Sequence, residues 1–390
     1  MKKILGVDKN VFYLSLVSLF NDFSSEMIYS VMPAFLVKSL NAPFWFIGFL
    51  EGFSEAFNNI LKIFSGRLSD FYNRRKIFAV LGYTFSNLTR FFLSFVNSLW
   101  QVFVLRIFDR FGKGLRDAPR DALIYLSSDK EELNKSYNFH RAFDTIGAIL
   151  GPLFGFLLLN YFLNLNYKLL FLIASFLGFF TMITFFWVKD KKDPDSKNKK
   201  FIFDFKIFPS PIKIYLLAIF IFSLGYLPLS LVLLRIQTID SSLKTLPLFY
   251  FLFNFFFVIF AFPLGKLGDR YGEKIMLKIG FLTSIFSFVL FSINDNFLIF
   301  PAIILLSLSL ALIDGMKMVY VGKNVASEFL GTAQGTLNAL YGFGQLFGGA
   351  FCGFIWSKFN FSFAFLLDAI LMFIGYLFLC FSLSVHHKTY

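Results

Sequence analysis

Long apolar runs recur twelve times along the 390 residues and constrain the fold more than any other feature. Each is roughly 20 residues long, the length of helix that crosses the hydrocarbon core of a bilayer. Because 57% of the chain is hydrophobic and 16% charged, we predict an integral, multi-pass, all-α membrane protein. The expected transmembrane helices are residues 11–37, 43–66, 77–97, 99–120, 137–161, 168–188, 212–236, 245–265, 274–294, 297–321, 332–357 and 361–384.

The spans fall into two sets of six, and a short charged stretch marks the same place in each set. Gly66-Arg67-Leu68-Ser69-Asp70 follows the second span, and Gly265-Lys266-Leu267-Gly268-Asp269 follows the eighth. Residues 189–210 between the sets are rich in lysine and interrupted by proline, with no hydrophobic face. We therefore predict a duplicated chain with an N-terminal bundle at 1–188, a cytoplasmic linker at 189–210 and a C-terminal bundle at 211–390.

The net charge of +13 is concentrated in alternate loops, as orientation signals are. This distribution predicts a protein of the cell inner (plasma) membrane with both termini cytoplasmic, and it argues against a nucleic-acid partner. Cys352 and Cys380 lie inside apolar runs, so we expect no disulfide framework and no metal site. We also expect no cofactor and no enzyme activity, because no Ser/His/Asp grouping or phosphate loop is present.

Acidic residues in the first two spans lie at membrane depth. Asp22 and Glu26 are four residues apart on one helix face, and the next span places Glu51, Glu55 and Asn58 along one stripe. A charge at the centre of a span costs about 2.5 to 3.5 kcal/mol, so these side chains are expected to face a central cavity rather than lipid. An acid there that lacks a permanent partner can bind and release a proton.

The third and fourth spans carry basic residues together with acids. Arg90 lies in the third span, and the fourth contains Arg106, Asp109, Arg110 and Lys113. Two interpretations stay open for these residues. They form structural ion pairs within the bundle, or they contact a transported solute. Lower down, Arg141 and Asp144 are expected to form an ion pair at the cytoplasmic end of the fifth span, where they would act as a gate.

The charged loop motifs resemble the inter-helix loop signature of the major facilitator superfamily. The second copy matches at Gly265, Asp269, Arg270 and Gly272, and the first keeps Gly66, Asp70, Arg74 and Arg75 with Asn73 in place of a glycine. Arg106-x-x-Asp109 is similar, in part, to a second signature that the family links to proton transfer. The fifth span contains Gly147, Gly151, Pro152 and Gly155, which resembles the motif of exporters that exchange a solute for protons.

This resemblance implies two pseudo-symmetric six-helix bundles with a cavity between them that opens alternately to either side. It implies a monomer that moves a small solute, with protons as the coupling ion. The proton-coupling candidates are Asp22, Glu26, Glu51, Glu55, Arg106 and Asp109. The candidates for the solute cavity are Asn21, Ser25, Asn58, Arg90, Arg110, Tyr226, Asn254, Asn338, Tyr341 and Gln345. Asp70 is expected to face Gly331 and Thr332, and Asp269 to face Tyr137.

Export coupled to protons is the favoured function, and two alternatives stay open. A proton-coupled importer of an organic anion or a metal chelate would use Arg90, Arg106 and Arg110 to hold its substrate. A membrane receptor or assembly partner that transports nothing would have no need of Asp22 and Glu26. The glycine motif of the fifth span also has a simpler reading, which is close helix packing alone.

Overall fold

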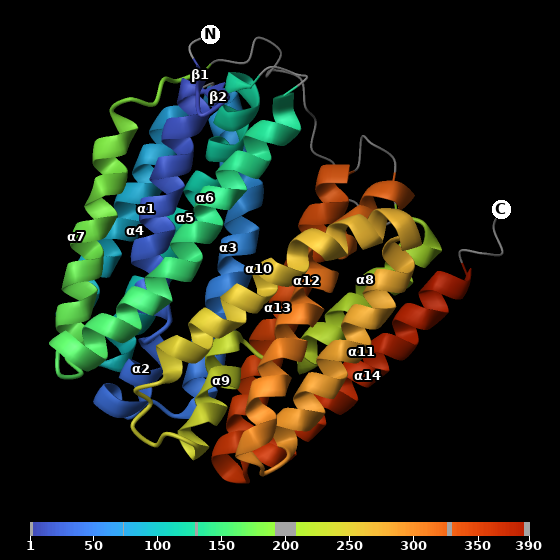
Figure 1. The fold of residues 1–390 in the computed structure, drawn as a ribbon. Coiled ribbons are helices and arrows are strands. Elements are labelled where there is room, and N and C mark those ends of the chain that lie inside the picture. Colours follow the sequence, from blue (N-terminus) through green and yellow to red (C-terminus); the bar gives the residue numbers. More distant parts are fainter. Residues whose placement is uncertain (1–2, 73, 129–131, 192–207, 326–329, 386–390) are drawn as a thin grey trace. The chain divides into compact units, whose positions relative to one another are not determined.

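A computed structural model gives the fold of residues 3–72, 74–128, 132–191, 208–325 and 330–385 (Figure 1). For some helical residues, among them 62–71, 266 and 269, it describes the backbone alone. All twelve predicted spans are helical. The first half consists of α1 Lys9–Tyr29, α2 Met32–Leu40, α3 Phe44–Tyr72, α4 Arg75–Leu93, α5 Leu99–Ser127, α6 Leu133–Leu157 with a π-helical turn at Leu158–Phe162, and α7 Tyr167–Phe185.

The second half repeats this order of helices. It consists of α8 Ser210–Gly225, α9 Leu229–Leu234 with a 3-10 turn at Arg235–Thr238, α10 Leu246–Tyr271, α11 Glu273–Ser292, a 3-10 turn at Asn296–Leu298, α12 Ile299–Asn324, α13 Leu330–Lys358 and α14 Phe361–Val385. Among the described residues, eight spans are long and apolar enough to cross a membrane by composition alone. The other four are α1, α3, α4 and α5, which carry the acidic and basic residues predicted to lie at membrane depth.

Helix packing follows one pattern in both halves. In the first half α1 packs against α6 and α7, while α4 packs against α5 and α7. In the second half α8 packs against α13 and α14, while α11 packs against α12 and α14. Each pair in one half thus has its counterpart at the same place in the other. The duplication inferred from the charged motifs is therefore present in the packing of the helices.

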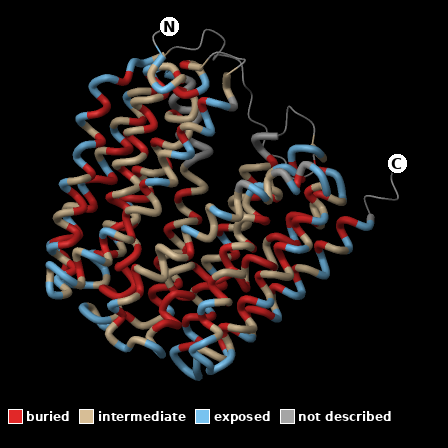
Figure 2. Tube along the Cα trace, in the orientation of Figure 1, coloured by how far each residue is buried: buried red, intermediate tan, exposed pale blue. Residues whose placement is uncertain are grey.

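The chain divides into two compact units. One comprises Met1–Leu40, Phe57–Lys200 and Lys244–Phe251, and the other comprises Asn41–Ala56, Phe201–Leu243 and Leu252–Tyr390. In both units the buried positions lie on the helix faces that meet other helices of the unit (Figure 2). The predicted boundary at residues 189–210 stays a prediction, because residues 192–207 lie outside the described part of the chain.

The first span of each half is interrupted, whereas the sequence predicted continuous helices over 11–37 and 212–236. The first break lies between Tyr29 and Met32, and the second lies between Gly225 and Leu229. Proline explains both breaks, because it lacks the N–H that would bond to the carbonyl four residues earlier. Pro33 follows the first break, and Pro228 is the N-cap residue of α9.

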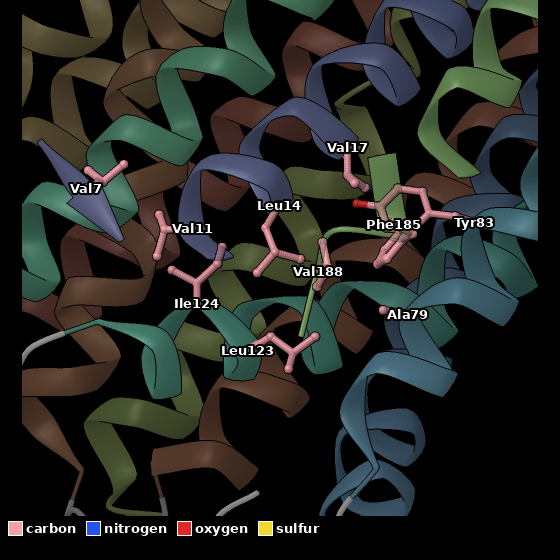
Figure 3. Close-up of a cluster of buried hydrophobic side chains, with 10 residues drawn as sticks. All are labelled: Val7, Val11, Leu14, Val17, Ala79, Tyr83, Leu123, Ile124, Phe185 and Val188. Atoms are coloured by element: carbon pink, nitrogen blue, oxygen red, sulfur yellow. The ribbon is translucent and has the colours of Figure 1, made fainter. Parts of the chain in front are cut away.

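A short hairpin closes one end of the first unit. Strands β1 Lys3–Ile4 and β2 Val7–Asp8 pair antiparallel, and the turn between them has positive φ at Leu5 and Gly6, as a tight two-residue hairpin requires. Val7 contributes to a buried apolar cluster with Val11, Leu14, Val17, Ala79, Tyr83, Leu123, Ile124, Phe185 and Val188 (Figure 3). This cluster joins α1, α4 and α5 to the segment that follows α7.

Two glycines let α13 approach α8 in the second unit. A methyl group at Gly348 would lie 1.9 Å from the carbonyl oxygen of Leu224, and one at Gly344 would lie 1.8 Å from the hydroxyl of Ser223. Neither distance is compatible with a side chain, so both positions require glycine for this packing. These glycines are the counterparts of the glycine motif on α6.

We expect Gly348→Ala to lower the free energy of unfolding by about 1–3 kcal/mol, the usual cost of overpacking a tight interior. The measurement is denaturant unfolding of the purified protein in detergent. Gly315→Ala is the matched control, because nothing lies within 4 Å of a methyl group built there in the middle of α12. Equal stabilities of the two variants would contradict the close packing of α8 and α13.

Candidate functional site

The glycines of α6 pack closely against α1 at the positions of its two acidic residues. A methyl group at Gly147 would lie 2.6 Å from the carbonyl oxygen of Leu19 and 3.2 Å from Cβ of Asp22. One at Gly151 would lie 2.7 Å from the carbonyl oxygen of Phe23 and 3.1 Å from Cβ of Glu26. The motif is thus a tight contact surface for the helix that carries the acids.

Pro152 and Gly155 complete the motif. The α6 helix continues through Pro152 as far as Leu157, and the five residues that follow form a π-helical turn. A methyl group at Gly155 would lie 3.2 Å from the carbonyl oxygen of Met27, so this end of the motif is less tightly packed than Gly147 and Gly151. The packing explanation of the motif is therefore supported, and it places the motif directly against the acids.

Asp22 is half-buried and is bonded by neutral groups of its own helix. The amide of Asn21 donates to its carboxylate at 2.7 Å, and Ser25 donates to its backbone carbonyl at 3.3 Å. The charged groups that act most strongly on it are Asp144, Arg116, Glu26 and Lys113. Among the described residues, no arginine or lysine nitrogen lies within 4.0 Å of this carboxylate.

Glu26 lies one turn further along α1 and has a hydrogen bond from Tyr250. The phenol of Tyr250, on α10, donates to the carboxylate of Glu26 at 2.7 Å. Lys113, Arg110 and Arg106 are the charged groups around Glu26. None of the described cationic side chains comes within 4.0 Å of it. The two α1 acids therefore lie near both acidic and basic side chains and are not locked into ion pairs among the described residues.

Asp109 on α5 is bonded quite differently from the α1 acids. The phenol of Tyr29 donates to its carboxylate, and the guanidinium groups of Arg106 and Arg110 lie 3.8 Å and 4.0 Å away. The Arg106 guanidinium also stacks over the ring of Tyr29 at 4.0 Å. These contacts are those of an ion-pair cluster, and the role of Asp109 and Arg106 in proton coupling stays a prediction. Tyr29 was missed, although it stands three residues after Glu26 on the same face of α1.

Among the described residues no carboxylate lies within 4.0 Å of the Arg90 guanidinium, so Arg90 does not form the ion pair that was one interpretation of this residue. It is 1% exposed, and its guanidinium donates to the backbone and side-chain oxygens of Asn21, to Ser24 and to Asn87 at 2.8–3.3 Å. Ser24 and Asn87 in turn donate to the α7 carbonyls of Ala174 and Gly178. Neutral groups of three helices thus hold a buried positive charge in one fixed position. No sequence signal identifies these acceptors.

Further along α5, acids and bases alternate. Arg116 lies 3.7 Å from Asp117 and donates to Ser86 at 2.9 Å, while Arg120 pairs with Asp121 at 2.9 Å. The expected ion pair between Arg141 and Asp144 is absent from the described contacts, because Arg141 points to the surface. The carboxylate of Asp144 instead lies 3.9 Å from Nε2 of His140, which is on the preceding turn of α6. This acid belongs with the buried charges around Asp22.

The remaining candidates are less completely described. Glu51 and Glu55 are half-buried, whereas Asn58 is fully buried. Arg74 and Arg270 are exposed, Arg75 is buried and donates to the carbonyl of Lys191, and Gly272 has the positive φ that glycine allows. Only the backbone is described for the gating candidates Gly66, Asp70 and Asp269 and for their expected contacts Gly331 and Thr332. A methyl group built at Gly265 would meet nothing within 4 Å.

In the second unit, two predicted cavity residues come together at the break in the seventh span. The rings of Tyr226 and Tyr341 lie 6.3 Å apart, and the ammonium of Lys317 lies 4.3 Å from the Tyr341 ring. Lys317 also pairs with Asp314 at 2.6 Å. Asn254, Asn338 and Gln345 are all half-buried. This cluster combines α8, α12 and α13.

A family model identifies the group to which this arrangement belongs. The model of the Major Facilitator Superfamily matches residues 14–252 and 215–389. The chain belongs to the Major Facilitator Superfamily. An uncharacterized MFS-type transporter of Methanocaldococcus jannaschii is 33% identical, with 96% of this chain and 95% of the relative covered. The prediction of a multi-pass membrane transporter that is not an enzyme is confirmed by this membership.

More distant relatives and solved structures extend the comparison. The class B tetracycline resistance protein of Escherichia coli is 25% identical over 70% of both chains. The crystal structure of the nucleoside transporter NupG superimposes with a TM-score of 0.79 over 96% of this chain and 99% of that one, at 16% identity. A crystal structure of the peptide transporter POT gives a TM-score of 0.81 at 12% identity, covering 99% and 96%. These likenesses confirm the superfamily fold.

We expect Arg90→Lys to lower the free energy of unfolding by about 1.5–3 kcal/mol, the value of one hydrogen bond to a charged group. Lysine keeps the charge but cannot reach acceptors on α1 and α4 together, because its donors sit on one compact nitrogen. Denaturant unfolding in detergent gives the value. Arg74→Lys, at an exposed site, should stay within ~0.5 kcal/mol of the wild type. A stable Arg90→Lys variant would show that the neutral acceptors do not hold the charge.

Proposed function

We propose that this protein is a proton-coupled exporter of a small solute that works by alternating access, with Asp22 and Glu26 as its proton-binding groups. The observation that carries this proposal is the contrast between the acids of the first unit. Asp109 has two arginines and a phenol around it, whereas Asp22 and Glu26 have only neutral hydrogen-bond donors. Acids that lack a permanent counter-charge are the ones free to exchange a proton.

The coupling we propose follows from the cost of burying charge. With Asp22 and Glu26 ionised, their negative charge offsets part of the positive charge of Arg106, Arg110, Lys113 and Arg116. When both acids carry a proton, they no longer offset that part of the positive charge, and the charge balance within the unit changes. The two facing states of the transporter would differ in how well they accommodate each charge state, and this difference is what couples proton binding to the switch.

Export is favoured by the relatives rather than by the geometry. Two relatives are named as tetracycline resistance proteins, one from Escherichia coli and one from Pasteurella multocida, and the latter is 24% identical over 90% of both chains. The fit of the α6 glycines to the α1 acids agrees with a motif that belongs to proton-exchanging exporters. We further propose a monomer in the cytoplasmic membrane with both termini cytoplasmic, the orientation that the loop lysines and arginines favour.

A second candidate function is the proton-coupled import of an organic anion or a metal chelate. Arg90 favours it, because no carboxylate among the described residues lies within 4.0 Å of this buried guanidinium. A fixed, unpaired arginine is suited to recognising a carboxylate or phosphate. Nucleoside and peptide transporters share only the fold with this chain, so their substrates do not decide between the two functions.

The proposal is tested by reconstitution into liposomes that contain a pH-sensitive dye and carry an imposed pH gradient. A panel of organic cations, organic anions and chelates is added, and the internal pH is followed. We expect at least one class to drive proton movement through the wild type. The direction of that movement relative to the solute separates exporter from importer. A wild-type protein that moves solute without any proton flux would contradict the proposal.

Asp22→Asn and Glu26→Gln each keep the shape of the side chain but remove the proton site. We expect both variants to reduce solute-driven proton flux to the level of empty liposomes, while exchange of labelled for unlabelled solute continues. Glu132→Gln is the control, since this surface carboxylate pairs with Lys3 at 2.7 Å, away from the buried charges. Full proton flux in both α1 variants would assign the coupling to other residues.

A further inference from the structure

Asp368 on α14 is a buried acid that the proposed transport mechanism does not use. It is 0% exposed, and α14 is otherwise one of the most apolar helices of the chain. The thiol of Cys352, on α13, donates a hydrogen bond to one oxygen of its carboxyl group. The other oxygen, Oδ2, is buried and has no hydrogen-bond partner among the described atoms.

The described surroundings of Asp368 contain no positive charge. α14 packs against α8, α11 and α13, and the thiol of Cys352 on α13 is the one titratable group among the described residues that acts on this carboxyl. From α8 the neighbour is Gly225, where a methyl group would lie 2.3 Å from the backbone carbonyl of Asp368. From α11, the rings of Phe288 and Phe291 pack against Phe365, one turn before Asp368.

Arg235, a fully buried cation of the same unit, is bonded elsewhere. Arg235 is 0% exposed and donates to the carbonyl oxygens of Phe291 and Ile293 at 3.1 Å and 3.0 Å. Its guanidinium also lies 3.9 Å from the centre of the Phe361 ring. These contacts place the charge at the carboxyl end of α11, where the helix dipole is negative. Arg235 therefore neutralises backbone dipoles and not Asp368.

We propose that Asp368 and Cys352 form a second proton-binding site, located in the second unit and separate from the α1 acids. An ionised carboxylate with a single thiol donor and no cation would be an uncompensated charge in an apolar interior, which is strongly disfavoured. The carboxyl group therefore carries its proton at neutral pH. The carbonyl oxygen accepts the thiol hydrogen, which leaves the protonated oxygen as Oδ2.

The position of this site gives the proton a structural consequence. Gly225 is the last residue of α8, directly before the break that separates α8 from α9, and it meets the backbone of Asp368. Loss of the proton would require α14 to expose the carboxylate to water, which its close packing on α8 and α13 opposes. The protonated carboxyl group is therefore the state compatible with the close packing of the broken seventh span against α14.

The test is infrared spectroscopy of the full-length protein in lipid at neutral pH, without substrate and without a pH gradient. We expect the Asp368→Asn variant to lose one carbonyl band of a protonated carboxyl group. Cys352→Ala should shift the same band to higher frequency, because the carbonyl loses its thiol donor. Cys380→Ala, which removes the other cysteine of the chain, should leave the band unchanged.

If the spectrum of Asp368→Asn keeps every protonated-carboxyl band of the wild type, Asp368 is ionised in the wild type and the proposal is overturned. Where Asp368→Asn does not fold, Cys352→Ala decides alone, since an unshifted spectrum in that variant contradicts the site. The result is independent of the transport proposal, because Asp22→Asn and Glu26→Gln change different bands. Loss of proton flux and loss of the Asp368 band are thus separate outcomes.

Discussion

The cost of placing charge in hydrocarbon governs this structure. Six-helix packing in the first unit brings acids and bases from α1, α4, α5 and α6 together. Asp109 lies near two arginines, whereas Asp22, Glu26 and Arg90 form hydrogen bonds with neutral groups. A single charge at the centre of a span costs about 2.5 to 3.5 kcal/mol, so these contacts are a condition for the fold and not an addition to it. The α1 helix is central because its acids are the least completely compensated.

The duplicated halves use the same packing for different purposes. Glycines on α6 and α13 let each helix approach the first helix of its own half, α1 and α8. In the first half this contact fixes two acids among basic side chains. In the second half the glycines of α13 contact Ser223 and the backbone of Leu224, close to the break after α8. The buried charges of this half, Arg235 and Asp368, do not pair with each other. One architecture therefore supports a charged half and a largely apolar half.

Much of this could be predicted from the sequence, because its causes are local. Apolar run length gives the twelve spans, and a four-residue spacing puts Asp22 and Glu26 on one helix face. The helix breaks at Pro33 and Pro228 could have been predicted from the same rules, since proline removes a backbone donor. Asp368 also had a signal, as a single acid in a long apolar run.

The remaining features depend on contacts between helices that sequence spacing does not encode. Arg90 is held by neutral groups of α1 and α4 backed by α7, and nothing in the local sequence separates this arrangement from an ion pair. The same holds for Tyr250, which reaches Glu26 from a helix more than 200 positions later. His140 rather than Arg141 approaches Asp144 because the helix face decides the contact, not the charge.

The central claim is that Asp22 and Glu26 exchange protons while Asp109 does not. Potentiometric titration of the purified protein, from mildly alkaline to mildly acidic pH, tests it without knowledge of the substrate. The account predicts that the Asp22→Asn/Glu26→Gln double variant takes up fewer protons than the wild type over this range. Identical titration curves for the two proteins would contradict it.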